Sequence, residues 1–194
     1  MISRAEQKSR TRDEVLQAAR RIVRRQGFAA TTARDVAAEA GVAVGTVFLH
    51  FPTMSRLAET LLDETVAAAL ATAEVSRPEG LIERLVQVSG CLYDAYDTEP
   101  ELSREVIAAS LFEGSAGGPS EVRMAEFRDW VAAEVAAAVR AGEIPQIAPT
   151  VAFMGYFALY FGALVTGLRG ELDRGAQLAL LRSSLQRLLV SKEN

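Results

Sequence analysis

Residues that could carry out chemistry are few and scattered in this chain of 194 residues. The sequence contains one histidine, His50, and one cysteine, Cys91. A single cysteine rules out an intrachain disulfide and a cysteine-based metal cage, and one histidine restricts catalysis by a nucleophile and a base. The carboxylates are scattered over expected helical positions, and no glycine-rich phosphate loop is present. The sequence therefore predicts no enzyme, no cofactor and no metal site.

Basic side chains, by contrast, gather in the first 60 residues. This segment holds ten Lys and Arg against six Asp and Glu, whereas the rest of the chain holds eleven against nineteen. The net charge of −4 thus combines a basic N-terminal part with an acidic remainder. Although charge fluctuates along any chain, this distribution favours a small head that meets nucleic-acid phosphates.

The stretch 31–51, TTARDVAAEAGVAVGTVFLHF, has the pattern of two short helices joined by a tight turn. Thr32 and Asp35 form a capping-box pattern that predicts a helix start. Gly41 supplies the left-handed conformation that ends this helix, and a second short helix is expected until Pro52 stops it. Such a pair is the DNA-binding helix-turn-helix, and an ordinary helical hairpin is the alternative.

Helical spacing of apolar residues continues along the chain, so the pattern predicts an all-α protein of about nine helices. The first clear helix is expected to begin at Thr11. Residues 1–10 are then a flexible basic arm, which is either a solvated tail or an arm that contacts DNA. Thr53 is expected to cap a long connecting helix, and Pro78 to begin the next one. Residues 113–119 are rich in glycine and predict a flexible loop.

The interval from Gln146 to Leu168 carries no charge. By length it could span a membrane, but Pro149 and Thr150 lie at one end and acidic residues lie close by. A helix that is apolar on every side also suits a protein in which one face packs on its own body and the other on a partner. We therefore expect no membrane contact.

The last helix, expected from about Asp173, repeats leucines at intervals of 3, 4 and 3, a seam suited to helix pairing. Together with the uncharged helix before it, this seam predicts a homodimer through a four-helix bundle. Three glycines of the uncharged helix, Gly155, Gly162 and Gly167, would allow another helix to approach closely. The expected interface residues are Tyr160, Gly162, Leu178, Leu181, Leu185 and Leu188.

Residues 11–62 resemble the N-terminal domain of the tetracycline-repressor (TetR) family of bacterial regulators. The residues that carry the resemblance, in order, are the capping Thr11, Gly27-Phe28, Thr31-Thr32, Val36-Ala37, Ala40-Gly41-Val42, Gly45-Thr46, Phe48, Phe51-Pro52 and Leu57. Beyond residue 62 only the all-helical architecture agrees. The resemblance implies a dimer whose body binds a small molecule and thereby releases double-stranded DNA with a palindromic operator. It also implies a DNA-binding domain at residues 1–52 and a ligand-binding and dimerisation domain at residues 53–194.

The resemblance further implies roles for single residues. Arg34 is the first choice for a bidentate contact to guanine, and His50 would contact phosphate. The segment 44–49 would lie in the major groove. The full set of expected DNA-binding residues is Thr32, Arg34, Val44, Gly45, Thr46, Phe48, Leu49 and His50.

Three positions depart from the family pattern. Ala43 stands where a capping Ser is common, Val44 where a polar or basic residue is common, and Met54 where a phosphate-binding Lys is common. Readout of the bases is therefore expected to lean on apolar contacts and on Arg34.

An effector pocket is expected among the helices between residues 53 and 168. For each of its candidate residues, plain core packing is the alternative. These candidates are Tyr93, Tyr96, Phe112, Phe127, Trp130, Phe153, Tyr156 and Phe157. Because the polar N-terminus lacks the apolar segment of a signal peptide, we expect a cytoplasmic regulator, most simply a repressor released by an apolar or amphipathic effector. A helical ligand-binding or interaction module without DNA binding is the alternative.

Overall fold

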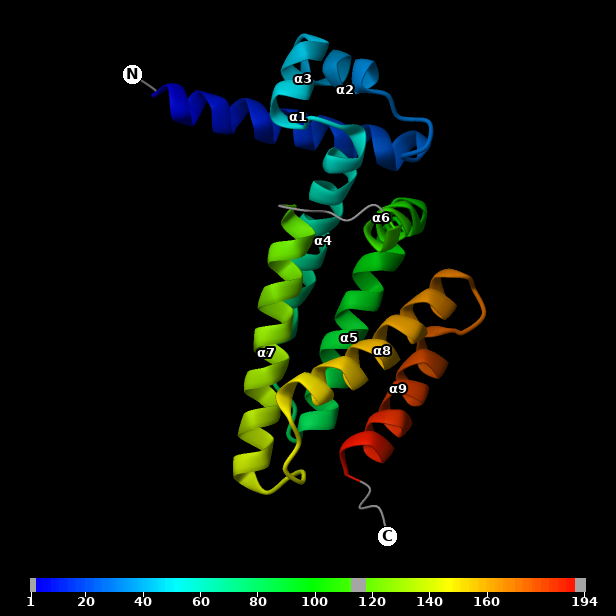
Figure 1. The fold of residues 1–194 in the computed structure, drawn as a ribbon. Helices are drawn as coiled ribbons and strands as arrows, with labels where there is room; N and C mark the ends of the chain where they lie inside the picture. Colours follow the sequence, from blue (N-terminus) through cyan, green and yellow to red (C-terminus); the bar gives the residue numbers. More distant parts are fainter. Residues whose placement is uncertain (1–2, 113–117, 191–194) are drawn as a thin grey trace. The chain divides into compact units, whose positions relative to one another are not determined.

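The computed structural model describes residues 3–112 and 118–190, except the side chain of Phe112 (Figure 1). These residues form nine α-helices and no strand, which confirms the predicted all-α class. The helices are α1 (Arg4–Gln26), α2 (Ala33–Ala40), α3 (Val44–His50), α4 (Met54–Val75), α5 (Leu81–Thr98), α6 (Pro100–Phe112), α7 (Pro119–Ala141), α8 (Pro149–Leu168) and α9 (Arg174–Leu189).

The chain divides into two compact units. The first comprises residues 1–64 and 99–120, and the second comprises residues 65–98 and 121–194. The division falls within α4, and α6 belongs to the first unit together with the N-terminal helices. The compact units therefore do not follow a single boundary after residue 52, and the assignment of functions to residues 1–52 and 53–194 stays a proposal.

Helix α1 begins earlier than the sequence pattern predicts. Ser3 is its N-cap: the Ser3 hydroxyl accepts a hydrogen bond from the backbone N–H of Glu6, and the Glu6 carboxylate accepts one from the N–H of Ser3. This capping box starts the helix at Arg4, so the prediction of a flexible arm over residues 1–10 and a helix start at Thr11 is wrong. Residues 4–10 are the first part of α1.

The predicted start and end of α2 are confirmed. Thr32 is the N-cap in a capping box with Asp35, and Gly41 follows the helix with φ 68° and ψ 31°. Glycine is favoured in this left-handed backbone conformation because glycine has no Cβ. Helix α3 then runs to His50 and ends before Pro52, also as predicted. In Figure 1, α2 and α3 lie together on α1.

The remaining boundaries agree closely with the pattern, with one exception. Thr53 accepts a hydrogen bond from the N–H of Arg56 and so caps α4, as expected. Pro78, however, lies before α5, which begins at Leu81 after Gly80 has taken a left-handed φ of 82°. The predicted flexible loop at 113–119 lies mostly outside the described residues.

In the second unit, α5, α8 and α9 pack against one another. Two of the glycines on α8 serve this packing inside the chain, because an added Cβ would meet Leu188 at Gly155 and Gln177 at Gly167. Helix α8 is long and apolar enough to cross a membrane by length and composition alone. Within the chain, 39% of this apolar stretch is buried. Among the described residues it is the one helix that meets this test.

Candidate nucleic-acid interface

The helices α1, α2 and α3 are held together by apolar side chains on their inner faces. Val36 on α2, Val47 on α3 and Phe51 just after it are almost fully buried, as are the side chains of α1 that face them. Burial of these side chains fixes which face of α3 turns outward. The predicted burial of Val47 and Phe51, four residues apart, is confirmed.

The start of α2 is held by a reciprocal set of hydrogen bonds. The Thr32 hydroxyl donates to the Asp35 carboxylate at 2.6 Å and accepts from the N–H of Asp35 at 3.2 Å, and the N–H of Thr32 donates to the same carboxylate. The hydrogen bond from the Thr32 hydroxyl, and then that from its N–H, lower the pKa of Asp35. Since its proton is directed to Asp35, the Thr32 hydroxyl fixes the helix rather than pointing its proton to a ligand.

The outer face of α2 and α3 carries most of the residues expected to meet DNA. Arg34, Gly45 and the apolar side chains of Val44, Phe48 and Leu49 are exposed. The other two, Thr46 and His50, are half-buried. Thr32 is exposed as well, so each of the eight predicted residues is at least partly accessible to solvent.

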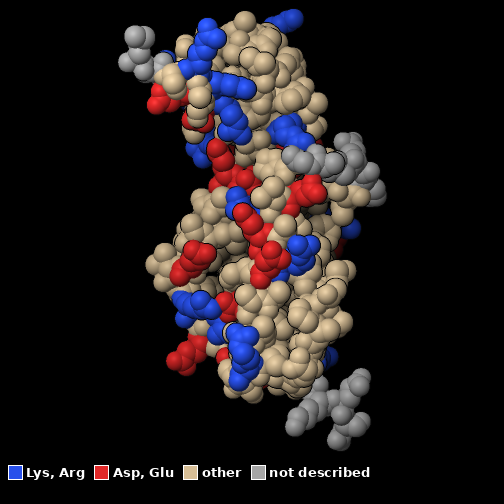
Figure 2. Space-filling model, turned by 60° about the vertical axis from the view of Figure 1, so that its left-hand side comes forward, with Lys and Arg blue, Asp and Glu red and all other residues tan. Residues whose placement is uncertain are grey.

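Most of the arginines on α1 already have carboxylate partners within the first unit. Arg20 pairs with Glu64 at 2.8 Å, and Arg21 pairs with Glu39 at 2.8 Å. Two further pairs join Arg25 to Glu39 and Arg24 to Glu99, each at 3.6 Å. Figure 2 shows Lys and Arg side chains over the visible face of this unit, at the top of the view, with acidic side chains close to several of them. The net positive charge of the segment is thus partly neutralised on this helix.

Two basic residues near the start of α1 lie beside α3, and sequence reasoning placed the first of them in a flexible arm. The Arg12 guanidinium lies 5.1 Å from the centroid of the Phe51 ring, a cation–π distance. Burial, followed by the positive charges of Lys8 and Arg12, lowers the pKa of His50. The capping box of Ser3 with Glu6 is the sequence signal that could have predicted the positions of Lys8 and Arg12, because it makes the helix continuous through Lys8.

The aromatic residues expected to line an effector pocket form a cluster in the second unit. Tyr93 stacks on Tyr160 with ring centroids 5.3 Å apart, and Phe127 stacks on Trp130 at 6.1 Å. Phe127 also touches Tyr156, and Phe153 stacks on Phe157. The cluster therefore joins α5, α7 and α8, while the side chain of Phe112 lies outside the description.

Hydroxyl groups in this cluster already have partners. The Tyr93 hydroxyl donates to the carbonyl of Tyr160 at 2.9 Å, and the Tyr156 hydroxyl lies 2.8 Å from that of Ser89. Burial is the main cause that raises the pKa of all three tyrosines, Tyr93, Tyr156 and Tyr160. Tyr96 is half-buried. The tyrosines therefore remain neutral at physiological pH.

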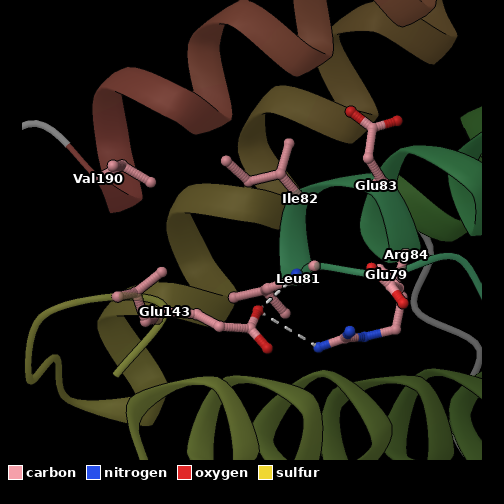
Figure 3. A pocket seen from close by; sticks show the side chains of 9 residues that line it. Glu79, Leu81, Ile82, Glu83, Arg84, Glu143 and Val190 are labelled. Carbon is pink, nitrogen blue, oxygen red and sulfur yellow. Dashed lines mark hydrogen bonds and ion pairs between the residues drawn. The ribbon is translucent and has the colours of Figure 1, made fainter. Parts of the chain in front are cut away.

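A cavity of about 630 Å³ lies elsewhere in the second unit, beside the N-terminal end of α5 (Figure 3). The Glu143 carboxylate accepts a hydrogen bond from the N–H of Leu81 at 2.9 Å and lies 3.8 Å from Arg84. Ile82 and Val190 add apolar surface from α5 and from the end of α9. None of the predicted aromatic residues lines this cavity.

Several residues expected at a dimer interface lie inside the chain. Tyr160, Leu181 and Leu185 are 4%, 1% and 0% exposed, because they pack in the core of the second unit. The leucine seam of α9 is therefore largely internal, and the expectation that these three residues contact a second copy does not fit their burial. Gly162 and Leu188 remain exposed, and Leu178 is half-buried. Large apolar side chains that are exposed on α8 and α9 include Val151, Met154, Leu180 and Leu188.

The described ranges, 3–112 and 118–190, hold no group of three His, Cys, Asp or Glu side chains that could bind a metal ion. Cys91 is half-buried, and burial together with Asp94 raises the pKa of its thiol.

The N-terminal helices are similar in sequence to known bacterial regulators of transcription. Residues 15–61 match the family model described as bacterial regulatory proteins, tetR family. A segment of 63 residues is 40% identical to the uncharacterized HTH-type transcriptional regulator YfiR of Bacillus subtilis strain 168. This match spans 30% of the chain and 31% of that relative. The matched proteins are named as regulators of transcription, which agrees with the prediction that the chain is not an enzyme.

Solved structures share the whole fold. A putative TetR-family transcriptional regulator from Rhodococcus sp. superposes with a TM-score of 0.68 at 22% identity, over 93% of this chain and 99% of that one. RolR, solved in complex with resorcinol, has a TM-score of 0.70 at 14% identity, over 96% of this chain and 90% of its own. The likeness extends beyond the matched segment to the helices of the second unit.

Proposed function

We propose that the chain, which matches the tetR family of bacterial regulatory proteins over residues 15–61, is a sequence-specific DNA-binding repressor of transcription. The observation that carries the proposal is the capped helix α2, the left-handed turn at Gly41 and the outward face of α3. In this arrangement α3 enters the major groove while α2 crosses the phosphate backbone.

Contacts with DNA then follow from exposure and chemistry. Arg34 is exposed and reaches guanine, whose two major-groove acceptors match a guanidinium. Thr46 and His50 contact phosphates or base edges at the border of the α3 face. The N-terminal end of α2 adds backbone N–H groups near Thr32.

We further infer a homodimer, because a palindromic operator presents two half-sites about one helical turn apart. Val151, Met154 and Leu180 give α8 and α9 an exposed apolar surface that a second copy can cover. With Gly162 and Leu188, these side chains take the place of the buried residues Tyr160, Leu181 and Leu185 in the proposed interface.

The second unit is proposed to bind a small apolar or amphipathic effector at the aromatic cluster, in the cytoplasm. The structural likeness to RolR, a protein solved with the aromatic ligand resorcinol, supports a compound of this size and kind. Binding would favour a dimer whose two α3 helices no longer match successive major grooves, and the operator would be released.

Selection of binding sites from random duplex DNA, followed by fluorescence anisotropy in a salt series, tests the DNA-binding role. We expect a palindromic site whose affinity falls steeply as salt rises, since phosphate contacts release counterions. Failure to recover any sequence, together with absence of salt-sensitive binding, would overturn the proposal. It would favour a module without DNA binding, in line with the departures at Ala43 and Met54.

The effector role is tested with the single tryptophan. Because Trp130 stacks on Phe127, a ligand that enters the cluster should change the tryptophan emission and should lower operator affinity at the same concentrations. Phe127→Ala should weaken both effects, whereas Ile82→Ala at the separate cavity should change neither. A tight ligand that alters fluorescence but leaves operator affinity unchanged contradicts release by an effector.

A further inference from the structure

The outward face of α3 is apolar. Val44, Phe48 and Leu49 are 36%, 43% and 70% exposed, although they lie on a helix of seven residues whose opposite side is anchored by Val47. These three side chains, with the exposed Gly45 between them, form what we call the α3 apolar face.

Groups that usually read bases are missing from α3. Its sequence, VGTVFLH, contains none of the side chains that make bidentate hydrogen bonds to guanine or adenine. Its two polar side chains, Thr46 and His50, are half-buried, and Arg34 lies on the preceding helix. Hydrogen bonding from α3 can therefore supply little of the discrimination between bases.

The surroundings of the α3 apolar face are basic. Arg34 is exposed on α2, and Lys8 and Arg12 act on His50 at the end of α3. The carboxylate nearest in sequence, Asp35, is turned to the cap of α2. An occupant that matches this surface must combine negative charge around it with apolar groups at its centre.

Duplex DNA combines negative charge with a central apolar group where a thymine lies in the major groove. The major groove offers a single apolar group, the C5-methyl of thymine, between two rows of phosphates. Resting on the proposed DNA-binding function, we propose that thymine methyl groups packed against Val44, Phe48 and Leu49 are a determinant of operator specificity, beside the guanine contact of Arg34. Removing one buried methyl group should weaken binding roughly fourfold, the hydrophobic contribution of one CH₂-sized group.

The test replaces thymine by 2′-deoxyuridine, one position at a time, in the operator recovered by site selection. Deoxyuridine keeps the base pair and its hydrogen bonds and lacks only the methyl group. We expect affinity to fall about threefold to fivefold at two or more thymines in each half-site. Deoxyuridine at thymines outside the half-sites serves as the control and should have no effect.

Leu49→Ala provides the matched protein variant, because a side chain that is 70% exposed contributes little to folding. The variant should lose sensitivity to deoxyuridine at the position that Leu49 covers and keep it elsewhere. The salt dependence of its binding should match that of the unchanged protein, since no phosphate contact is altered.

Two results would overturn the inference. If the protein binds its operator but every deoxyuridine substitution changes affinity by less than about 1.5-fold, well under the expected effect of one methyl group, thymine methyls do not determine specificity and the DNA-binding function stands. If the protein binds no DNA at any salt concentration, both this inference and the proposed function fail, and the α3 apolar face serves a protein partner.

Discussion

At the residue scale, basic side chains that look equivalent in the sequence have different partners in the structure. Arg21 and Arg25 share the carboxylate of Glu39, whereas Arg34 is exposed and no hydrogen bond or ion pair holds it among the described residues. A guanidinium that already neutralises a neighbouring carboxylate gains less from a phosphate, because it must give up that partner. Arg34 is therefore the stronger choice for a contact with DNA.

Arg34→Ala should weaken operator binding about tenfold or more and relax the preference for guanine at one position, the effect of losing a bidentate contact. Arg21→Ala is the matched control and should change affinity less than threefold, since Arg21 is paired with Glu39. Fluorescence anisotropy with the operator and with single-base variants measures both. Equal losses for the two variants would mean that only overall charge matters.

His50 combines a lowered pKa with two positive neighbours, Lys8 and Arg12. A DNA phosphate beside the imidazole would favour the protonated form and raise this pKa, so binding would take up a proton. Operator affinity should therefore increase as the pH falls from about 7.5 to about 5.5, by up to about tenfold for each unit by which DNA raises the pKa.

Anisotropy titrations at constant ionic strength check this dependence, and His50→Gln should give a flat profile. The folding stability of the free protein has the opposite dependence on pH from the operator affinity. Since the folded pKa lies below the ordinary value of 6.5, the unfolded chain binds the proton more readily, and His50 lowers stability as the pH falls through that window. A flat profile for the unchanged protein would show that His50 does not meet phosphate.

At the element scale, capping residues decide where the N-terminal helices begin. The box of Ser3 with Glu6 makes α1 continuous from Arg4, and the box of Thr32 with Asp35 sets the first residue of α2. Helix α3 has no side-chain N-cap, because the Ala43 side chain cannot accept a hydrogen bond. The position of α3 therefore depends on the turn at Gly41 and on the burial of Val47 and Phe51.

Thr32→Ala removes the side chain that caps α2 and should lower the free energy of unfolding by about 1 kcal/mol, the typical value for an N-cap residue. Thr32→Ser keeps the hydroxyl and should cost much less. Urea denaturation followed by circular dichroism measures the difference. Equal losses for both variants would point to the methyl group of Thr32 rather than to its hydroxyl.

At the scale of the whole molecule, basic charge and the exposed apolar surface of α8 occur in different parts of the chain. The acidic remainder of the sequence disfavours contact with DNA, so non-specific binding is expected at the basic N-terminal segment. In the second unit, exposed apolar side chains on α8 lie on a helix that carries no charge. Such a surface is costly in water, and it is the surface that we propose a second copy of the chain covers.

Met154→Glu places a charge on this exposed apolar surface and should convert the dimer to a monomer in sedimentation velocity. Val122→Glu is the control, because Val122 is similarly exposed, at 59% against 57% for Met154, but lies on α7. Operator affinity should fall for Met154→Glu because one head binds one half-site. A dimer that survives this substitution would require another interface.

The sequence alone determined most of the local elements, although the predicted starts of α1 and α5 were wrong. Capping residues at Thr32 and Asp173, the glycine at 41 and the proline at 149 act through their own backbone or near neighbours, and the helix ends they predict are those observed. The match to the family model likewise rests on short-range order and spacing within residues 15–61.

Tertiary structure decided what depends on contacts between distant residues. The leucine seam of α9 has the spacing of an exposed pairing surface, but Leu181 and Leu185 are buried within the chain, where α9 packs on α5 and α8. Only the fold shows that Glu39 pairs with two of the arginines of α1 and that the positive charge of Lys8 lowers the pKa of His50. Periodicity states which side chains share a helix face, but whether that face meets the core, another charge or solvent depends on the packing of the other helices.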